Sequence, residues 1–162
     1  MKKIVSIALS LMMVLSLVAC GGSNSSSAKE APDLSKYYED FMSSLGADNT
    51  PMMMELDADM TEAFYAGLNE IETKQKVMQA AAMSAVPFEF ALVEVANADD
   101  AAKVEEIFQA RKEAQVAGGA WYPETIAAWE KAEIITNGNV VALIVAGETQ
   151  TDAVDAFNAL FK

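Results

Sequence analysis

Arg111 is the residue best suited to bind an anion, because it is the only arginine of the 162-residue chain. Its guanidinium offers a planar fork of N–H groups to a carboxylate or phosphate. In the predicted helix its neighbours three and four positions away are Ile107, Phe108, Ala114 and Gln115, and none of them is acidic. No ion pair along the helix is therefore available. Two readings stay open: Arg111 pairs with an acid across the fold while its stem packs at the core margin, or it binds an anionic ligand.

Three further candidates for ligand or partner binding follow the glycine pair Gly118-Gly119. They are Trp121, Tyr122 and Glu124, grouped around a proline that suits the first turn of a helix. Aromatic residues beside two glycines could form the rim of a binding site, or they could seal the edge of a core and use one polar atom for a local hydrogen bond.

The composition excludes most familiar catalytic and metal sites. Histidine is absent, which rules out Ser-His-Asp and Cys-His catalysis and histidine-ligated zinc. A calcium loop starting at Asp57 fails, because Glu62 stands where glycine is required and Leu68 where glutamate is required. The run Met52-Met53-Met54 has no histidine or free cysteine beside it to complete a copper site. Paired carboxylates remain possible, yet with 24 acidic residues some pair is always close. We therefore predict no catalytic residue, no metal ligand and no cofactor.

Cys20 is the only cysteine, and it ends a segment typical of an export signal. Lys2 and Lys3 precede an apolar run, Ile4–Ala19, whose 16 residues reach only ~24 Å as a helix, short of a ~30 Å hydrocarbon core. Leu17-Val18-Ala19-Cys20 resembles the bacterial lipobox, in which cleavage before the cysteine accompanies its lipidation. We therefore expect Cys20 to carry acyl chains such as palmitate, with an ordinary secretory peptide as the alternative.

This interpretation divides the chain into three parts. Residues 1–19 form a lipoprotein signal peptide, residues 20–32 contain the lipidated cysteine and a flexible Gly/Ser-rich linker, and residues 33–162 form a single domain. A domain of this length can bury ~70% of its unfolded surface, so it needs no disulfide or metal for stability.

The chain is strongly acidic, with 11 basic and 24 acidic residues and a net charge of −13. Loss of Lys2 and Lys3 with the signal peptide leaves 9 basic residues and a net charge of 9 − 24 = −15. We expect no binding to nucleic acid, because phosphate backbones require clustered Lys and Arg. Attachment to an anionic membrane must come from the acyl chains on Cys20 rather than from the protein surface.

The hydrophobic pattern and the turn residues predict an alternation of helices and strands. A helix begins after Asp33 and ends near Gly46, and a short helix that continues to Leu68 is capped by Asp59. The segment 69–86 stays open between helix and strand. The remaining elements are a strand over 51–59, a strand over 87–96, a helix over 98–117, a helix over 123–131, strands over 132–136 and 139–146 that flank Asn137-Gly138, and a helix over 149–161.

These elements predict an α+β fold. We expect an antiparallel sheet of about four or five strands with helices packed mainly on one face.

The order of motifs resembles a family of small bacterial lipoproteins that share a domain of unknown function, number 4358. The resemblance rests on the lipobox and linker, the strand Pro87–Val95, the helix that bears Arg111, the Tyr122-Pro123-Glu124 segment, and the hairpin at Gly138 with its apolar second strand. It covers roughly residues 34–161 and implies no activity, because the family has none established.

Together these features predict a membrane-anchored lipoprotein that faces the outside of the cell, in the outer leaflet of a Gram-positive-type membrane. We expect a binding or interaction module rather than an enzyme, with a protein, a cell-wall component or a small molecule as partner. The alternatives are a carboxylate-based hydrolase acting on cell-wall material and an accessory or scaffold subunit of a surface complex. A hydrolase requires two acids in one cleft with Arg111, Trp121 or Tyr122, and a scaffold requires an exposed apolar patch.

Overall fold

The computed structural model describes residues 31–162, and the predicted signal peptide and Cys20 lie outside the described residues. The helices are α1 (Leu34–Ser44), α2 (Ala58–Phe64), α3 (Ala101–Ala114), α4 (Pro123–Glu130) and α5 (Gln150–Ala159). The strands are β1 (Met53–Glu55), β2 (Thr73–Ala81), β3 (Phe88–Val95), β4 (Glu133–Asn137) and β5 (Val140–Ala146).

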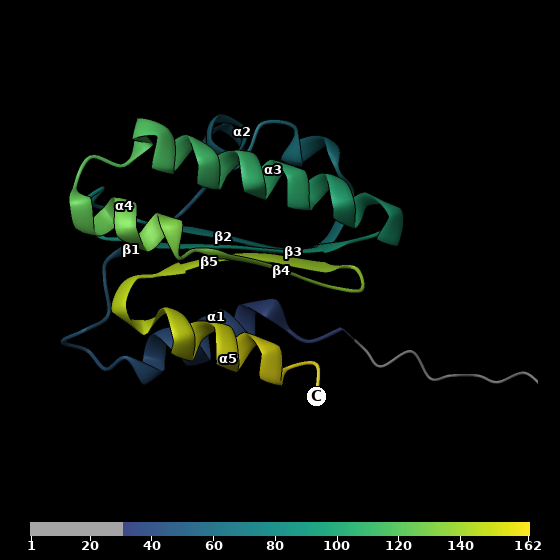
Figure 1. Cartoon of the computed structure of the whole chain (residues 1–162). Coiled ribbons are helices and arrows are strands. Elements are labelled where there is room, and N and C mark those ends of the chain that lie inside the picture. The colour runs from purple at the N-terminus through teal and green to yellow at the C-terminus, as the bar shows by residue number, and fades with distance from the viewer. Residues whose placement is uncertain (1–30) are drawn as a thin grey trace, which may run out of the picture. The chain divides into compact units, whose positions relative to one another are not determined.

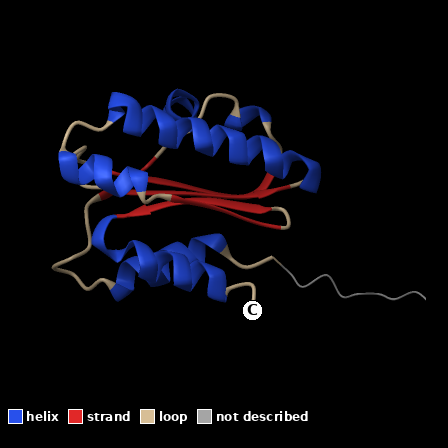
Figure 2. Ribbon diagram, viewed as in Figure 1, coloured by secondary structure: helices blue, strands red, loops and turns tan. Residues whose placement is uncertain are grey.

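The five strands form one antiparallel sheet in the order β1-β2-β3-β5-β4. Figure 2 shows this sheet between two layers of helices. The predicted α+β class and the predicted antiparallel sheet are confirmed.

Helices cover both faces of the sheet rather than mainly one (Figure 1). Along β3, Phe90 and Leu92 pack in a cluster with α1 and α5, whereas Ala91 and Val93 pack in a second cluster with α2, α3 and α4. The reason for the difference is the composition of the central strands: every residue of β5 is buried. A strand that is apolar on both faces must be covered on both faces.

The helix starts follow side-chain caps. Asp33 accepts a hydrogen bond from the backbone N of Lys36 at 2.9 Å, as predicted. In α2 the cap is Asp57, which accepts from the backbone N of Met60 at 2.8 Å. The sequence placed this cap at Asp59, two residues too late, because both aspartates precede residues with helical spacing.

The segment that the sequence left open is mostly strand. It contains β2, which pairs with β1 on one side and β3 on the other. The predicted hairpin at Asn137-Gly138 joins β4 to β5, and Gly138 adopts a φ of 62°, which favours glycine.

The two ends of the sheet differ in what they carry. At one end Gln75 donates to Glu94 Oε2 at 2.7 Å and to the carbonyl of Pro32 at 3.1 Å, where the chain enters α1. The other end carries the turn between β2 and β3 and the connection between α3 and α4.

Among residues 31–162, no helix combines the length and apolar character that crossing a bilayer requires.

Candidate functional site

Arg111 forms a two-pronged ion pair with Glu89. Its Nε donates to Glu89 Oε1 at 2.9 Å and its Nη2 donates to Glu89 Oε2 at 2.8 Å. Glu89 is the second residue of β3 and points to the face that α3 covers. The side chains keep only 12% and 7% of their surface exposed. Parallel hydrogen bonds between a guanidinium and a carboxylate fix both groups in one geometry.

Aromatic rings enclose the guanidinium of Arg111. Its Cζ atom lies 4.2 Å from the ring centre of Phe64, 5.3 Å from that of Trp129 and 5.8 Å from that of Tyr65. The hydroxyl of Tyr65 also donates a hydrogen bond to Glu89 Oε1. The cation therefore gains ring contacts from α2 and α4 in addition to its carboxylate.

The protonation states of this group follow from burial and from Glu89. Burial raises the pKa of Tyr65 well above its usual value, and the charge and hydrogen bond of Glu89 raise it further. Burial alone would lower the pKa of Arg111, but the hydrogen bond and charge of Glu89 outweigh it and raise that pKa. Tyr65 is thus a neutral donor and Arg111 a cation at neutral pH.

A cavity of about 330 Å³ opens over this ion pair. We call it the arginine cavity. It lies between α2, the turn from β2 to β3, and the end of α3. Its lining includes Phe64, Met83, Glu89, Arg111, Gln115 and Trp129. Because Arg111 Nη1 takes no part in the pair with Glu89, the guanidinium retains a donor beyond that pair.

The wall at the end of α3 is a π turn, Gln115–Gly119, in which the backbone N of Ala120 donates to Gln115 O at 2.9 Å. The sequence predicted a helix over 98–117 that ends at the glycine pair; α3 ends at Ala114, and the π turn carries the helical segment on to Gly119, where it ends. Gly118 has a φ of 133°, and a Cβ on Gly119 would meet Gln115 Nε2 at 2.7 Å and Ala114 O at 2.9 Å. Both positions therefore require glycine, and such wide turns are frequent at functional sites.

Large hydrophobic side chains are exposed around the arginine cavity. Among the described residues four such side chains are exposed, namely Met52 (75%), Met83 (62%), Trp121 (84%) and Tyr122 (48%). We call them the apolar rim. Met83 lines the cavity itself, and the other three lie within three residues of Met54 or Gly119, which also line it. The rim residues thus belong to three separate loops that contribute to the cavity lining or adjoin it in sequence.

The structure places the candidates from the sequence as follows. Arg111 lies in the cavity and pairs with an acid across the fold, one of the two readings left open. Trp121 and Tyr122 are rim residues, and Glu124 is exposed in the first turn of α4. The loop before α4 is held by Thr125, whose Oγ1 donates to Tyr122 O at 2.8 Å and accepts from Tyr122 N at 3.2 Å.

Sequence reasoning missed the residues that surround Arg111. Glu89 gave the clearest available signal, because an acid inside an apolar strand requires a partner when buried. Phe64, Tyr65 and Trp129 gave none, since helical spacing predicts only that they belong to a core. Among residues 31–162 no group of three or more acidic, histidine or cysteine side chains is arranged to hold a metal ion.

Comparison with known proteins identifies the domain. A domain of unknown function (DUF4358) matches residues 46–146, which contain all five strands, α2, α3, α4 and the whole arginine cavity. Neither the curated proteins nor the solved structures include a match to this chain. Because the matched residues make up more than half of the chain, the protein belongs to the DUF4358 family.

Proposed function

We propose that this protein is a lipid-anchored binding module on the outside of the cell, and that a partner polypeptide docks on the apolar rim. The observation that carries the proposal is the placement of the rim. Of the four exposed large hydrophobic side chains among the described residues, Met83 lines the cavity, and Met52, Trp121 and Tyr122 follow or precede the lining residues Met54 and Gly119 by two or three positions. A cluster of exposed apolar side chains at one place marks an interaction site, whereas scattered ones need no explanation.

The residue types fit a protein partner. Trp, Tyr and Met are enriched in protein interfaces, and tryptophan and tyrosine dominate the residues that carry most of the binding energy. Trp121 is the most exposed of the rim residues at 84%. The cavity beneath is large enough to receive an apolar side chain of the partner, and Glu124 beside the rim suits a basic residue.

The position of the rim suits a protein that is anchored through Cys20. The chain enters the described domain at Pro32, at the sheet end that carries Gln75 and Glu94. The arginine cavity lies at the opposite end, near Glu89, ~17 Å further along β3 at ~3.4 Å per residue. The chain therefore enters the described domain at the end of the sheet opposite to the arginine cavity. The two or more acyl chains of a bacterial lipoprotein suffice for stable anchoring.

At the arginine cavity, binding without catalysis is favoured over the hydrolase alternative. Hydrolysis of a glycosidic bond by carboxylates uses two of them. Of the described residues that line the arginine cavity, only Glu89 carries a carboxylate, and both of its oxygens accept hydrogen bonds from Arg111. Glu89 therefore serves to hold Arg111 rather than to transfer protons.

Site-specific cross-linking in intact cells tests the proposal. A photoreactive p-benzoylphenylalanine is placed at position 121 or 83 of the lipidated protein, and at Asp155 of α5 as an exposed control. We expect the same discrete adduct from positions 121 and 83 and none from position 155. Equal adducts at all three positions, or none at the rim, would contradict docking at this surface.

A further inference from the structure

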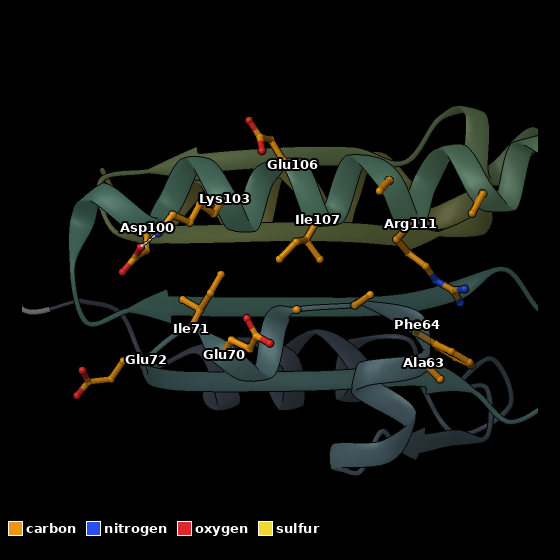
Figure 3. A pocket seen from close by; sticks show the side chains of 14 residues that line it. Ala63, Phe64, Glu70, Ile71, Glu72, Asp100, Lys103, Glu106, Ile107 and Arg111 are labelled. Carbon is orange, nitrogen blue, oxygen red and sulfur yellow. Dashed lines mark hydrogen bonds and ion pairs between the residues drawn. The ribbon is translucent and has the colours of Figure 1, made fainter.

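A second, larger hollow runs along α3 on the side that faces α2 and the short turn Leu68–Glu70 (Figure 3). We call it the α2–α3 groove. It has a volume of about 800 Å³. Ile71 and Ile107 point toward one another across it, while Phe64 and Arg111 lie at one end. It is separate from the apolar rim, because none of the four rim residues lines it.

The walls of the groove allow another chain to approach closely. They are built from Ala63, Ala66 and Gly67 on one side and from Ala110 and Ala114 on the other. Small residues on facing walls, with apolar side chains between them, suit the apolar face of an inserted polypeptide segment.

The groove also carries negative charge that the two cations in its own lining do not balance. Glu70, Glu72 and Glu106 line it, are exposed, and take part in none of the four salt bridges among the described residues. The two cations in its lining are already engaged. Lys103 pairs with Asp100 at 2.7 Å, and Arg111 pairs with Glu89 at 2.8 Å.

We infer that the α2–α3 groove binds a basic amphipathic segment of a partner polypeptide. The apolar face of the segment contacts Ile71 and Ile107, and its Lys or Arg side chains lie over Glu70, Glu72 and Glu106. From Asp100 to Arg111 the helix spans ~16 Å at ~1.5 Å per residue, which accommodates a helical segment of about three turns. Charge complementarity excludes a second copy of this acidic chain and an anionic lipid surface as occupants.

A model peptide tests this inference. The probe is a fluorescein-labelled 14-residue helix of Leu and Lys with one apolar face, titrated into the full chain carrying Cys20→Ser, so that no lipid competes for the peptide. Fluorescence anisotropy at low salt gives the dissociation constant. We expect saturable binding that weakens with added salt, and no binding by the Leu/Glu counterpart.

Two matched triple variants locate the binding. Glu70→Gln/Glu72→Gln/Glu106→Gln removes the groove charges. Glu39→Gln/Glu130→Gln/Glu148→Gln removes the same charge from exposed sites elsewhere. The groove triple should weaken binding roughly tenfold, the sum of three exposed charge contacts, and the control triple by less than about threefold. Ala110→Trp, which fills the groove from an exposed position, should weaken binding without lowering the melting temperature.

Three results would overturn the inference. The first is that the Leu/Lys peptide does not bind at low salt. The second is that the control triple variant weakens binding as much as the groove triple variant. The third is that Ala110→Trp leaves binding unchanged. Spermine is a second test ligand, because it carries positive charge without an apolar face. If spermine binds as tightly as the peptide, the groove is a site for small polycations rather than for a polypeptide segment.

Discussion

Glu89 and Arg111 lie 22 residues apart in the chain and meet through two parallel hydrogen bonds of 2.9 and 2.8 Å between β3 and α3. Tyr65 adds a third donor to the same carboxylate. This contact fixes the position of α3 over the sheet and forms the floor of the arginine cavity. The cavity therefore depends on a charge pair that is mostly withdrawn from water.

Glu89→Ala should destabilise the fold strongly, because it leaves the buried charge of Arg111 without its carboxylate. The expected loss is about 3–5 kcal/mol in the free energy of unfolding, measured by urea denaturation. Glu113→Ala, which removes an exposed carboxylate from α3, is the control and should change stability by no more than about 0.5 kcal/mol. An equal loss in both variants would show that the pair does not hold α3.

Replacing both partners should be much less harmful than replacing one. In Glu89→Met/Arg111→Met no unpaired charge remains, and methionine fills irregular space well. We expect the double variant to recover most of the stability lost in Glu89→Ala. Losses that simply add up in the double variant would contradict a direct coupling between the two side chains.

Tyr65 should make stability fall at alkaline pH. Burial, then the charge and hydrogen bond of Glu89, raise the pKa of Tyr65 in the folded state. The folded protein thus holds this proton when the unfolded chain has lost it. The contribution is complete below the unfolded pKa of about 10 and is lost as pH rises above it. Tyr65→Phe should be less stable by about 1–3 kcal/mol at neutral pH.

The difference between wild type and Tyr65→Phe should shrink as pH rises from about 10, as followed by urea denaturation. Tyr37 and Tyr38, whose pKa values burial also raises, are present in both proteins and cancel in the comparison. A difference that stays constant up to the highest pH at which the fold survives would contradict the predicted titration.

Gly119→Ala should disrupt the π turn at the cavity wall. The added Cβ meets both the side-chain amide of Gln115 and the carbonyl oxygen of Ala114, at 2.7 and 2.9 Å. We expect a loss of about 1–3 kcal/mol in thermal unfolding experiments. The loss should persist when Gln115→Ala is added, since the backbone carbonyl remains. Full recovery in that background would show that only the flexible side chain opposed the change.

Local residues revealed much of the fold in advance. Asp33 marked a helix start and Asn137-Gly138 marked a hairpin, because caps and turns are decided by a few neighbouring residues. The segment with β2 was ambiguous for the opposite reason. Its Ala and Gln residues favour a helix, and the strand is stabilised by pairing with β1 and β3, which are distant in sequence.

The site was only partly predictable. Arg111 stood out as the sole arginine without an acidic helical neighbour, so a partner across the fold was one of two readings. Its identity as Glu89 depends on the packing of α3 against β3, which no local pattern shows. Trp121 and Tyr122 were candidates by residue type, but the approach of their loop to the cavity lined by Met54 and Met83 follows from the topology of the fold.

Cys20→Ser should release the protein from the membrane. We propose that acyl chains on this cysteine attach the protein, because an acidic domain is repelled by anionic lipid. Fractionation of cells should find the wild type in membranes and the variant mainly in soluble fractions or culture fluid, with mass spectrometry showing acyl groups only on the wild type. An unmodified thiol on a protein that still fractionates with membranes would contradict the assignment.

Native gel electrophoresis of gently solubilised membranes tests the proposed binding function most directly. The wild type should migrate in a discrete complex larger than the lipidated monomer. Trp121→Ala/Met83→Ala should migrate as the monomer, with an unchanged melting temperature because both side chains are exposed. Tyr38→Ala on α1, away from the rim, should keep the complex if it remains folded. A rim variant that stays in the same complex as the wild type would contradict the central claim.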